Sequence, residues 1–172
     1  MMEDNHKVIV LPQSVFDEEM ERMKLDDSNV EDVKDKAFIS IIGTPECLTY
    51  YLNEPETKHW FNDNHSNVLN LDFDDLGEDR VYEGHLFKAM SDEQAEDVVR
   101  FIEDNLGKDF IIHCRAGKSR SQAIGLFILS NYNRHFANHQ PAVEPYFANK
   151  GVLRKLNRIL WKRAIEKDKL TD

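Results

Sequence analysis

Short apolar runs alternate along the chain with longer amphipathic stretches. This pattern predicts strands separated by helices. Four runs predict strands, each bounded by polar residues, proline or glycine: residues 6–11, 37–42, 67–73 and 110–113. Strands that alternate with helices indicate an α/β fold with a central, mostly parallel sheet flanked by helices. We expect one domain over residues 1–172, without an internal repeat or an interdomain linker.

Helices are predicted where apolar positions recur at helical spacing. The clearest signal begins at the capping box Ser91-Asp92-Glu93-Gln94, runs to about Leu106 and ends before Gly107. Another helix is expected at residues 15–23, with Ser14 in position to cap it. The remaining helices are predicted at residues 46–52, 119–132 and 151–167, and the polar segments 26–35, 53–66 and 74–84 are expected to be loops.

Composition limits the classes of protein. Apolar residues make up 41% of the chain, which is enough for a real core. No apolar run approaches the ~20 residues of a membrane-spanning helix, so membrane insertion is not expected. The acidic start, without a long apolar stretch, argues against a secretory signal. Two cysteines without zinc spacing do not make a disulfide scaffold, and a reducing, cytoplasmic setting is expected.

Charge is divided unevenly along the sequence. Residues 1–106 carry 27 acidic and 9 basic side chains, a balance of −18, whereas residues 107–172 carry 5 and 13, a balance of +8. The basic part suggests that an anion binds there, although two solvated faces would explain the same counts. The net charge of −10 does not favour duplex nucleic acid as a partner, because proteins that bind it are usually basic.

The segment FIIHCRAGKSRSQ, residues 110–122, is predicted to run from a strand through a loop into a helix. Unpaired backbone N–H groups and the positive end of the helix dipole make such a junction an anion site. Gly117 permits a tight loop whose N–H groups point inward.

The side chains of this segment suit attack on phosphorus. The field that attracts an anion also lowers the pKa of Cys114 and favours its nucleophilic thiolate. Arg120 has a planar guanidinium that can bind two oxygens of a phosphate. Ser121 can donate a hydrogen bond to the sulfur when it leaves.

These residues match the signature His-Cys-x5-Arg-Ser/Thr, and the sequence resembles the cysteine-based protein tyrosine phosphatases, in particular their compact dual-specificity branch. The resemblance covers residues 67–129 and implies a dual-specificity phosphatase-like fold. Gln122 departs from the pattern, because many relatives have Pro or Gly there. No cofactor and no metal is expected.

The resemblance also implies roles for individual residues. Cys114 would be the nucleophile, Arg120 would bind phosphate, and Ser121 would assist breakdown of the phosphocysteine. His113 would help to set the pKa of the cysteine through the loop. The residues implied to bind phosphate are Arg115, Ala116, Gly117, Lys118, Ser119 and Arg120.

Family catalysis needs a general acid on a loop that follows a strand. Alternation in residues 67–73 places Leu69, Leu71 and Phe73 on one face and Asp72 on the other, together with Asp74 beyond the strand. Asp75 lies just past the strand end and is the preferred acid. The alternatives are Asp74, Asp72 and Asp79, or a turn whose carboxylates are only solvated.

The function expected is hydrolysis of phosphate monoesters through a phosphocysteine, on phosphotyrosine and on phosphoserine or phosphothreonine of a phosphorylated protein substrate. Arg115 and Lys118 leave open a polyanionic phospho-substrate, a phosphoinositide or an RNA 5′-triphosphate, because phosphoinositide phosphatases of this superfamily are basic at these two positions. A catalytically inactive phosphoprotein-binding module is a further alternative. Low-molecular-weight phosphatases place the cysteine near the N terminus, which does not fit this order.

Three other features are weaker. The histidine pairs 59/65 and 135/139 have metal-like spacing but no third ligand type nearby. Trp60 and Phe61 are expected in the core or at the rim of the cleft. Cys47 is interpreted as a structural cysteine, with oxidative pairing to Cys114 as the alternative.

Overall fold

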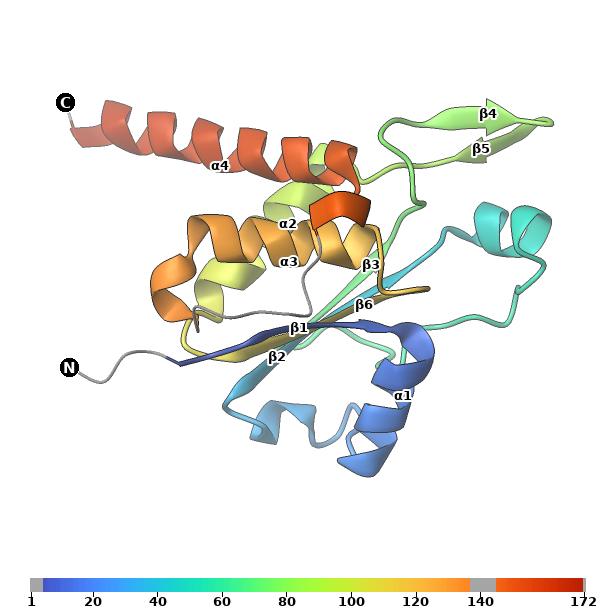
Figure 1. Ribbon diagram of the computed structural model, residues 1–172, viewed down its shortest axis with the longest axis horizontal. Helices are drawn as coiled ribbons and strands as arrows, with labels where there is room; N and C mark the ends of the chain where they lie inside the picture. Colours follow the sequence, from blue (N-terminus) through green and yellow to red (C-terminus); the bar gives the residue numbers. More distant parts are fainter. Residues whose placement is uncertain (1–4, 137–144, 172) are drawn as a thin grey trace.

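The computed structural model describes residues 5–136 and 145–171 (Figure 1). Its centre is a four-stranded sheet whose neighbours are all parallel, in the order β1-β6-β2-β3. The strands are β1 (Val8–Pro12), β2 (Lys36–Ile42), β3 (Val68–Asp72) and β6 (Asp109–Cys114). The sequence-based prediction of an α/β fold with a parallel central sheet is confirmed.

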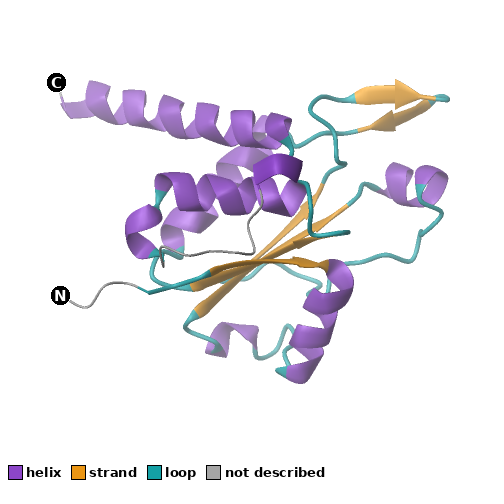
Figure 2. Ribbon diagram, viewed as in Figure 1, coloured by secondary structure: helices purple, strands orange, loops and turns teal. Residues whose placement is uncertain are grey.

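Helices cover both faces of this sheet (Figures 1 and 2). One face carries α2 (Asp92–Asp104), α3 (Arg120–Asn131) and α4 (Lys150–Thr171), and the other carries α1 (Gln13–Arg22). Each face has its own hydrophobic core, so the inner strands are apolar on both sides. In β2, for example, Ile39 and Ile41 pack toward α2–α4, whereas Phe38 packs toward α1.

The capping box of α2 is present as predicted. The Ser91 hydroxyl accepts from the backbone N–H of Gln94 at 3.1 Å, and the Gln94 side chain accepts from the backbone N–H of Ser91 at 3.0 Å. These reciprocal bonds satisfy two of the donors that a helix start leaves unpaired.

The start of α1 differs from the prediction. The helix begins at Gln13, its N-cap position is Pro12, and no side chain caps it, so the assignment of Ser14 as the cap was wrong. The physical reason is a tertiary contact: the Gln13 N–H donates to the carbonyl of Arg115 at 3.2 Å. The loop after β6 therefore takes the role that a capping side chain would have had.

The predicted acidic loop over residues 74–84 was wrong in its second half. Arg80–Tyr82 forms β4, and His85–Phe87 forms β5, which pair as an exposed antiparallel hairpin (Figure 1). Glu83 and Gly84 both have positive φ, at 50° and 79°, as a two-residue hairpin turn requires. Strands of three residues give no recognisable alternation, so pattern analysis missed them.

Smaller elements complete the chain. The predicted short helix is a π-helical turn at Cys47–Tyr51, and the predicted loop at 26–35 contains a 3₁₀ turn at Val30–Asp32. Further 3₁₀ turns lie at Asn133–His135 and Pro145–Phe147. Across the residues that the structure describes, no helix is both long and apolar enough to cross a membrane.

Candidate active site

The candidate site lies at the carboxyl edge of the sheet, where parallel α/β sheets commonly bind ligands. β6 ends at Cys114, the loop 115–119 follows, and α3 begins at Arg120. Gly117 has a φ of 69°, and a Cβ atom there would lie 2.6 Å from the backbone nitrogen of Pro12. Only glycine fits both the conformation and the close approach of β1. The Gln122 side chain donates to the Gly117 carbonyl at 3.0 Å and holds the loop from the helix side.

Cys114 is buried, and its Sγ lies 3.0 Å from the Ser121 hydroxyl. Burial by itself raises the pKa of the thiol. Hydrogen bonds from the hydroxyl and backbone N–H of Ser121, the charge of Arg120 and the Ser119 N–H outweigh that effect, so the pKa of Cys114 lies below its ordinary value. The arrangement favours a thiolate where the sequence predicts a nucleophile.

Arg120 has a buried guanidinium that joins two segments of the site. Its Nη1 donates to the backbone carbonyl of Phe73 at 2.7 Å, which ties the start of α3 to the chain that follows β3. The Nε atom of Arg120 is one of the buried side-chain polar atoms in the described residues without a hydrogen-bond partner. A buried donor without a partner is costly, so this atom suits an anionic oxygen.

Of the carboxylates considered as general acids, Asp75 is the one that contacts the loop. Its Oδ1 accepts from the Ser119 hydroxyl at 2.7 Å and from the Asn149 side-chain amide at 2.8 Å. Asn149 also accepts from the Val152 N–H at 3.1 Å, so the residue that caps α4 also positions Asp75. Both bonds fall on Oδ1, and Asp75 also lines the cleft that contains Cys114.

The alternation predicted that Asp74 faces solvent, and this prediction was wrong. Its carboxylate is 2% exposed and accepts from the N–H and hydroxyl of Thr44, at 2.9 and 2.8 Å, and from the N–H of Lys88 at 2.8 Å. The alternation of β3 ends at Asp72, and the chain then turns inward. Three donors satisfy this carboxylate, which makes Asp74 a structural bridge between segments rather than a free acid.

Asp72 and Asp79, the remaining carboxylates considered as acids, have other partners. The Asp72 side chain contacts the His59 ring at 2.5 Å, and the Asp79 side chain accepts from the Ala89 N–H at 3.0 Å. Neither residue lines the cleft that contains Cys114.

The two extra bases of the loop differ in their surroundings. Both guanidinium contacts of Arg115 go to the Glu54 carboxylate, at 3.2 and 2.8 Å. Arg115 and Lys118 both line the cleft, as do Ala116 and Ser119. Of the loop residues expected to bind phosphate, Arg115 thus has a competing partner for its charge.

A cleft of about 590 Å³ opens over Cys114. The sequence did not indicate that the hairpin and the π-helical turn contribute to it, because these segments lie far from Cys114 in the chain. They add an aromatic wall and one more cation: Tyr51, Tyr82, Phe87 and Arg80. Tyr51 and Phe87 pack edge to face, with ring centroids 6.2 Å apart. Tyr51 and Tyr82 are both more than half exposed and so present ring surface to a ligand.

Cys47 also lines this cleft. Burial raises the pKa of its thiol to about 11, with the Asp74 charge adding to the effect. This thiol therefore stays protonated at neutral pH, and its pKa is shifted in the opposite direction from that of Cys114. Oxidative pairing of the two remains a prediction.

The histidine pairs do not form a common site in the described part of the chain. His59 binds Asp72, and His65 binds Asp27 at 2.8 Å, so the two rings have separate partners. His139 lies outside the described residues. Within residues 5–136 and 145–171 no group of three or more metal-binding side chains comes together.

No family model matches the sequence, and no curated protein matches it either. Two solved structures have a similar course of the chain. The crystal structure of PTPMT1 is 15% identical over 96% of this chain and 96% of that chain, with a TM-score of 0.47. The crystal structure of Tk-PTP in the active form is 21% identical over 90% of this chain and 80% of that chain, with a TM-score of 0.36. At these values, function has to be argued from the residues of the site.

Proposed function

We propose that the protein hydrolyses phosphate monoesters through a phosphocysteine on Cys114. One observation carries the proposal: a thiol of lowered pKa lies at the floor of a strand–loop–helix anion site, beside a buried guanidinium whose Nε has no partner. A thiolate and an anion-binding loop together favour attack on a phosphate rather than on a neutral group.

The chemistry follows from the positions of the side chains. The Cys114 thiolate attacks phosphorus in line with the ester oxygen, while the loop N–H groups and Arg120 neutralise charge on the remaining oxygens. Asp75 gives its proton to the leaving oxygen. Water then cleaves the S–P bond, with Asp75 as the base, and the Ser121 hydroxyl stabilises the departing thiolate.

Turnover of p-nitrophenyl phosphate tests this proposal. We expect hydrolysis that orthovanadate inhibits and that Cys114→Ser abolishes, because a serine hydroxyl does not ionise here. The same variant should still bind phosphate, since the loop N–H groups and Arg120 remain. Substantial turnover by a clean preparation of Cys114→Ser would exclude the phosphocysteine. Binding of phosphoprotein without turnover by the unmodified protein would instead support an inactive binding module.

The wall of the cleft favours an aryl phosphate in a phosphoprotein as substrate. Tyr51, Tyr82 and Phe87 offer ring faces and edges that can pack on the phenyl ring of phosphotyrosine. Tyr82→Ala should raise KM for a phosphotyrosine peptide several-fold and leave KM for the matched phosphoserine peptide nearly unchanged. Equal effects on both peptides would mean that the aromatic wall does not select the substrate.

A polyphosphorylated substrate is the second candidate, because Arg80 and Lys118 both line the cleft. A phosphoinositide or an RNA 5′-triphosphate would carry further phosphates to these cations. Turnover of a phosphopeptide, an inositol lipid and a triphosphorylated RNA should be compared in Lys118→Ala. Lys162→Ala, at an exposed position on α4, is the control. Loss for only the polyphosphorylated substrates would favour this candidate.

A further inference from the structure

A continuous hydrogen-bonded chain runs from Cys114 to the opposite side of the sheet. His113 is fully buried, and its Nδ1 lies 3.2 Å from the carbonyl oxygen of Cys114. Its Nε2 lies 2.6 Å from the hydroxyl of Ser40, its register partner on β2. The Ser40 hydroxyl is also 2.6 Å from Nδ1 of His59, whose Nε2 is 2.5 Å from Oδ1 of Asp72.

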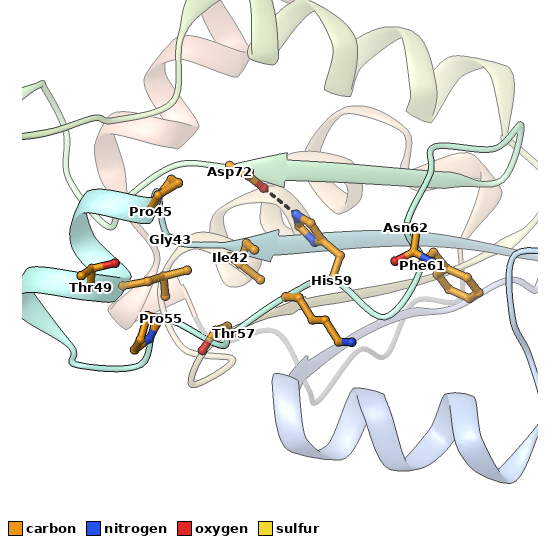
Figure 3. A pocket seen from close by; sticks show the side chains of 12 residues that line it. Ile42, Gly43, Pro45, Thr49, Pro55, Thr57, His59, Phe61, Asn62 and Asp72 are labelled. Carbon is orange, nitrogen blue, oxygen red and sulfur yellow. Dashed lines mark hydrogen bonds and ion pairs between the residues drawn. The ribbon is translucent and has the colours of Figure 1, made fainter.

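The outer end of this hydrogen-bonded chain, at His59 and Asp72, lies at a second cavity. His59 and Asp72 line a hollow of about 320 Å³ that is separate from the cleft over Cys114 and shares Gly43 with it. Figure 3 shows the His59 ring directed toward Asp72 at the end of β3. At the inner end, Phe16 of α1 packs on the His113 ring with centroids 4.3 Å apart, and this contact excludes water from the ring.

The direction of each hydrogen bond can be assigned. A carbonyl oxygen only accepts, so Nδ1 of His113 carries a proton and donates to Cys114. Burial lowers the pKa of His113 to about 4, so its Nε2 is an unprotonated acceptor at neutral pH. Ser40 must then donate its single proton to His113 and accept from Nδ1 of His59.

The same logic assigns the outer end of the hydrogen-bonded chain. With Nδ1 of His59 donating to Ser40, a contact of 2.5 Å between its Nε2 and the Asp72 carboxyl needs a proton between them. The Asp72 side chain is thus the outer hydrogen-bond partner that holds the His59 ring in this orientation.

We propose that His59, held by Asp72, is a positioning residue for the nucleophile and acts through Ser40 and His113. The proposal rests on the proposed function, because it assigns a purpose to Cys114. From Nδ1 of His59 inward, each donor points toward Cys114, which keeps His113 in the one tautomer that can donate to the Cys114 carbonyl. That bond orients the first peptide of the loop, whose N–H groups stabilise the thiolate.

A purely structural role would have different consequences. His59 lies in the segment between the π-helical turn and β3, and its bonds also attach this segment to the sheet. Loss of that attachment would change stability but would not alter the tautomer of His113 or the ionisation of Cys114. The thiol and the ring nitrogens are therefore the quantities to measure.

The test compares His59→Gln with His65→Gln. His65 is a matched control because it also pairs with an aspartate, and its side chain is 15% exposed against 13% for His59. It does not belong to the hydrogen-bonded chain that leads to Cys114. Alkylation of Cys114 by iodoacetamide, followed by mass spectrometry across pH, gives the thiol pKa. We expect a rise of about one pH unit in His59→Gln and no shift in His65→Gln. Equal behaviour of the two variants would overturn the proposal.

Nitrogen-15 NMR of the histidine rings gives a second, independent readout. In the unmodified protein at neutral pH, His113 should carry its proton on Nδ1, and His59 should carry a proton on its own Nδ1. Asp72→Asn changes a half-exposed side chain and should fold, and in it the nitrogen-15 shift of His59 Nε2 should change because its hydrogen-bond partner changes. An unprotonated Nδ1 of His59, or an Nε2–H tautomer of His113, would contradict the assignment. Both readouts are independent of turnover, so an inactive protein that shows these shifts would refute only the proposed function.

Discussion

Two adjacent carboxylates at the end of β3 have opposite surroundings. Asp74 is buried and binds three donors, whereas Asp75 contacts Ser119 and Asn149 at the edge of the cleft. Both carboxylates line the cleft, but Asp74 is only 2% exposed whereas Asp75 is exposed, so Asp75 is the more accessible to a leaving oxygen. At the residue scale, the contacts therefore favour Asp75 for proton donation.

Asp75→Asn should lower kcat for a phosphotyrosine peptide by about 10²–10⁴, because the leaving oxygen then receives no proton. The effect should be far smaller for an activated aryl phosphate, whose leaving group hardly needs one. The basic limb of the pH–rate profile should also disappear, since it reports the acid losing its proton. Steady-state kinetics of both substrates across pH measure all three effects.

Asp74→Asn is the matched comparison. It should keep the basic limb but lower the free energy of unfolding by about 1–3 kcal/mol, because an amide cannot accept from all three donors. If Asp74→Asn loses the basic limb and Asp75→Asn keeps it, Asp74 is the acid.

Arg120→Lys should weaken both binding and catalysis. Lysine retains a charge but has neither the Nη1 that holds the Phe73 carbonyl nor a second nitrogen for phosphate. We expect kcat/KM to fall by about 10²–10⁴ and the inhibition constant for orthovanadate to rise. Near-native kinetics would show that the loop does not bind phosphate through this side chain.

At the scale of elements, the loop between β6 and α3 depends on its contact with β1. Gly117 approaches Pro12 and Leu11 so closely that a methyl group would overlap their backbones. The same contact supplies the first hydrogen bond of α1, between Gln13 and Arg115. The conformation of the loop around Cys114 therefore depends on the positions of β1 and α1.

Gly117→Ala should destabilise the protein by about 2–4 kcal/mol and abolish most activity, since the loop must shift. Gly107→Ala is the control: it has a φ of 90° but no atom within 4 Å of the added Cβ, so it carries only the conformational strain of about 1 kcal/mol. Urea unfolding and turnover of both variants measure the difference. Equal loss of stability would mean that the contact with β1 is not tight.

At the scale of the whole molecule, the buried His113 links folding to pH. Its pKa falls from 6.5 to about 4, mainly through burial, so below pH 6.5 the unfolded chain binds a proton that the folded protein excludes. This contribution to stability is fully present above pH 6.5 and is lost as pH falls toward 4. It makes the fold sensitive to mild acid.

The free energy of unfolding should therefore fall by about 2 kcal/mol between pH 7 and pH 5 from this residue alone. Urea titrations at several pH values should show the slope, and His113→Gln should have less of it, whatever its absolute stability. An unchanged slope in His113→Gln would assign the pH dependence to other groups.

Local sequence determined the features whose physical cause is local. The strand periods, the capping box of α2 and the strand–loop–helix segment around Cys114 depend on neighbours a few residues apart, so their patterns were visible in the chain. The same reasoning placed Leu69, Leu71 and Phe73 correctly on the buried face of β3.

Tertiary structure decided the rest. The start of α1, the burial of Asp74, the support of Asp75 by Asn149 and the chain from His59 to Cys114 all join residues more than ten positions apart. Hydrogen bonds of this kind depend on the register of the strands and on how loops fold over the sheet edge, as in the pairing of Ser40 with His113. Because no local pattern encodes register between distant strands, only the folded molecule shows which polar side chains meet.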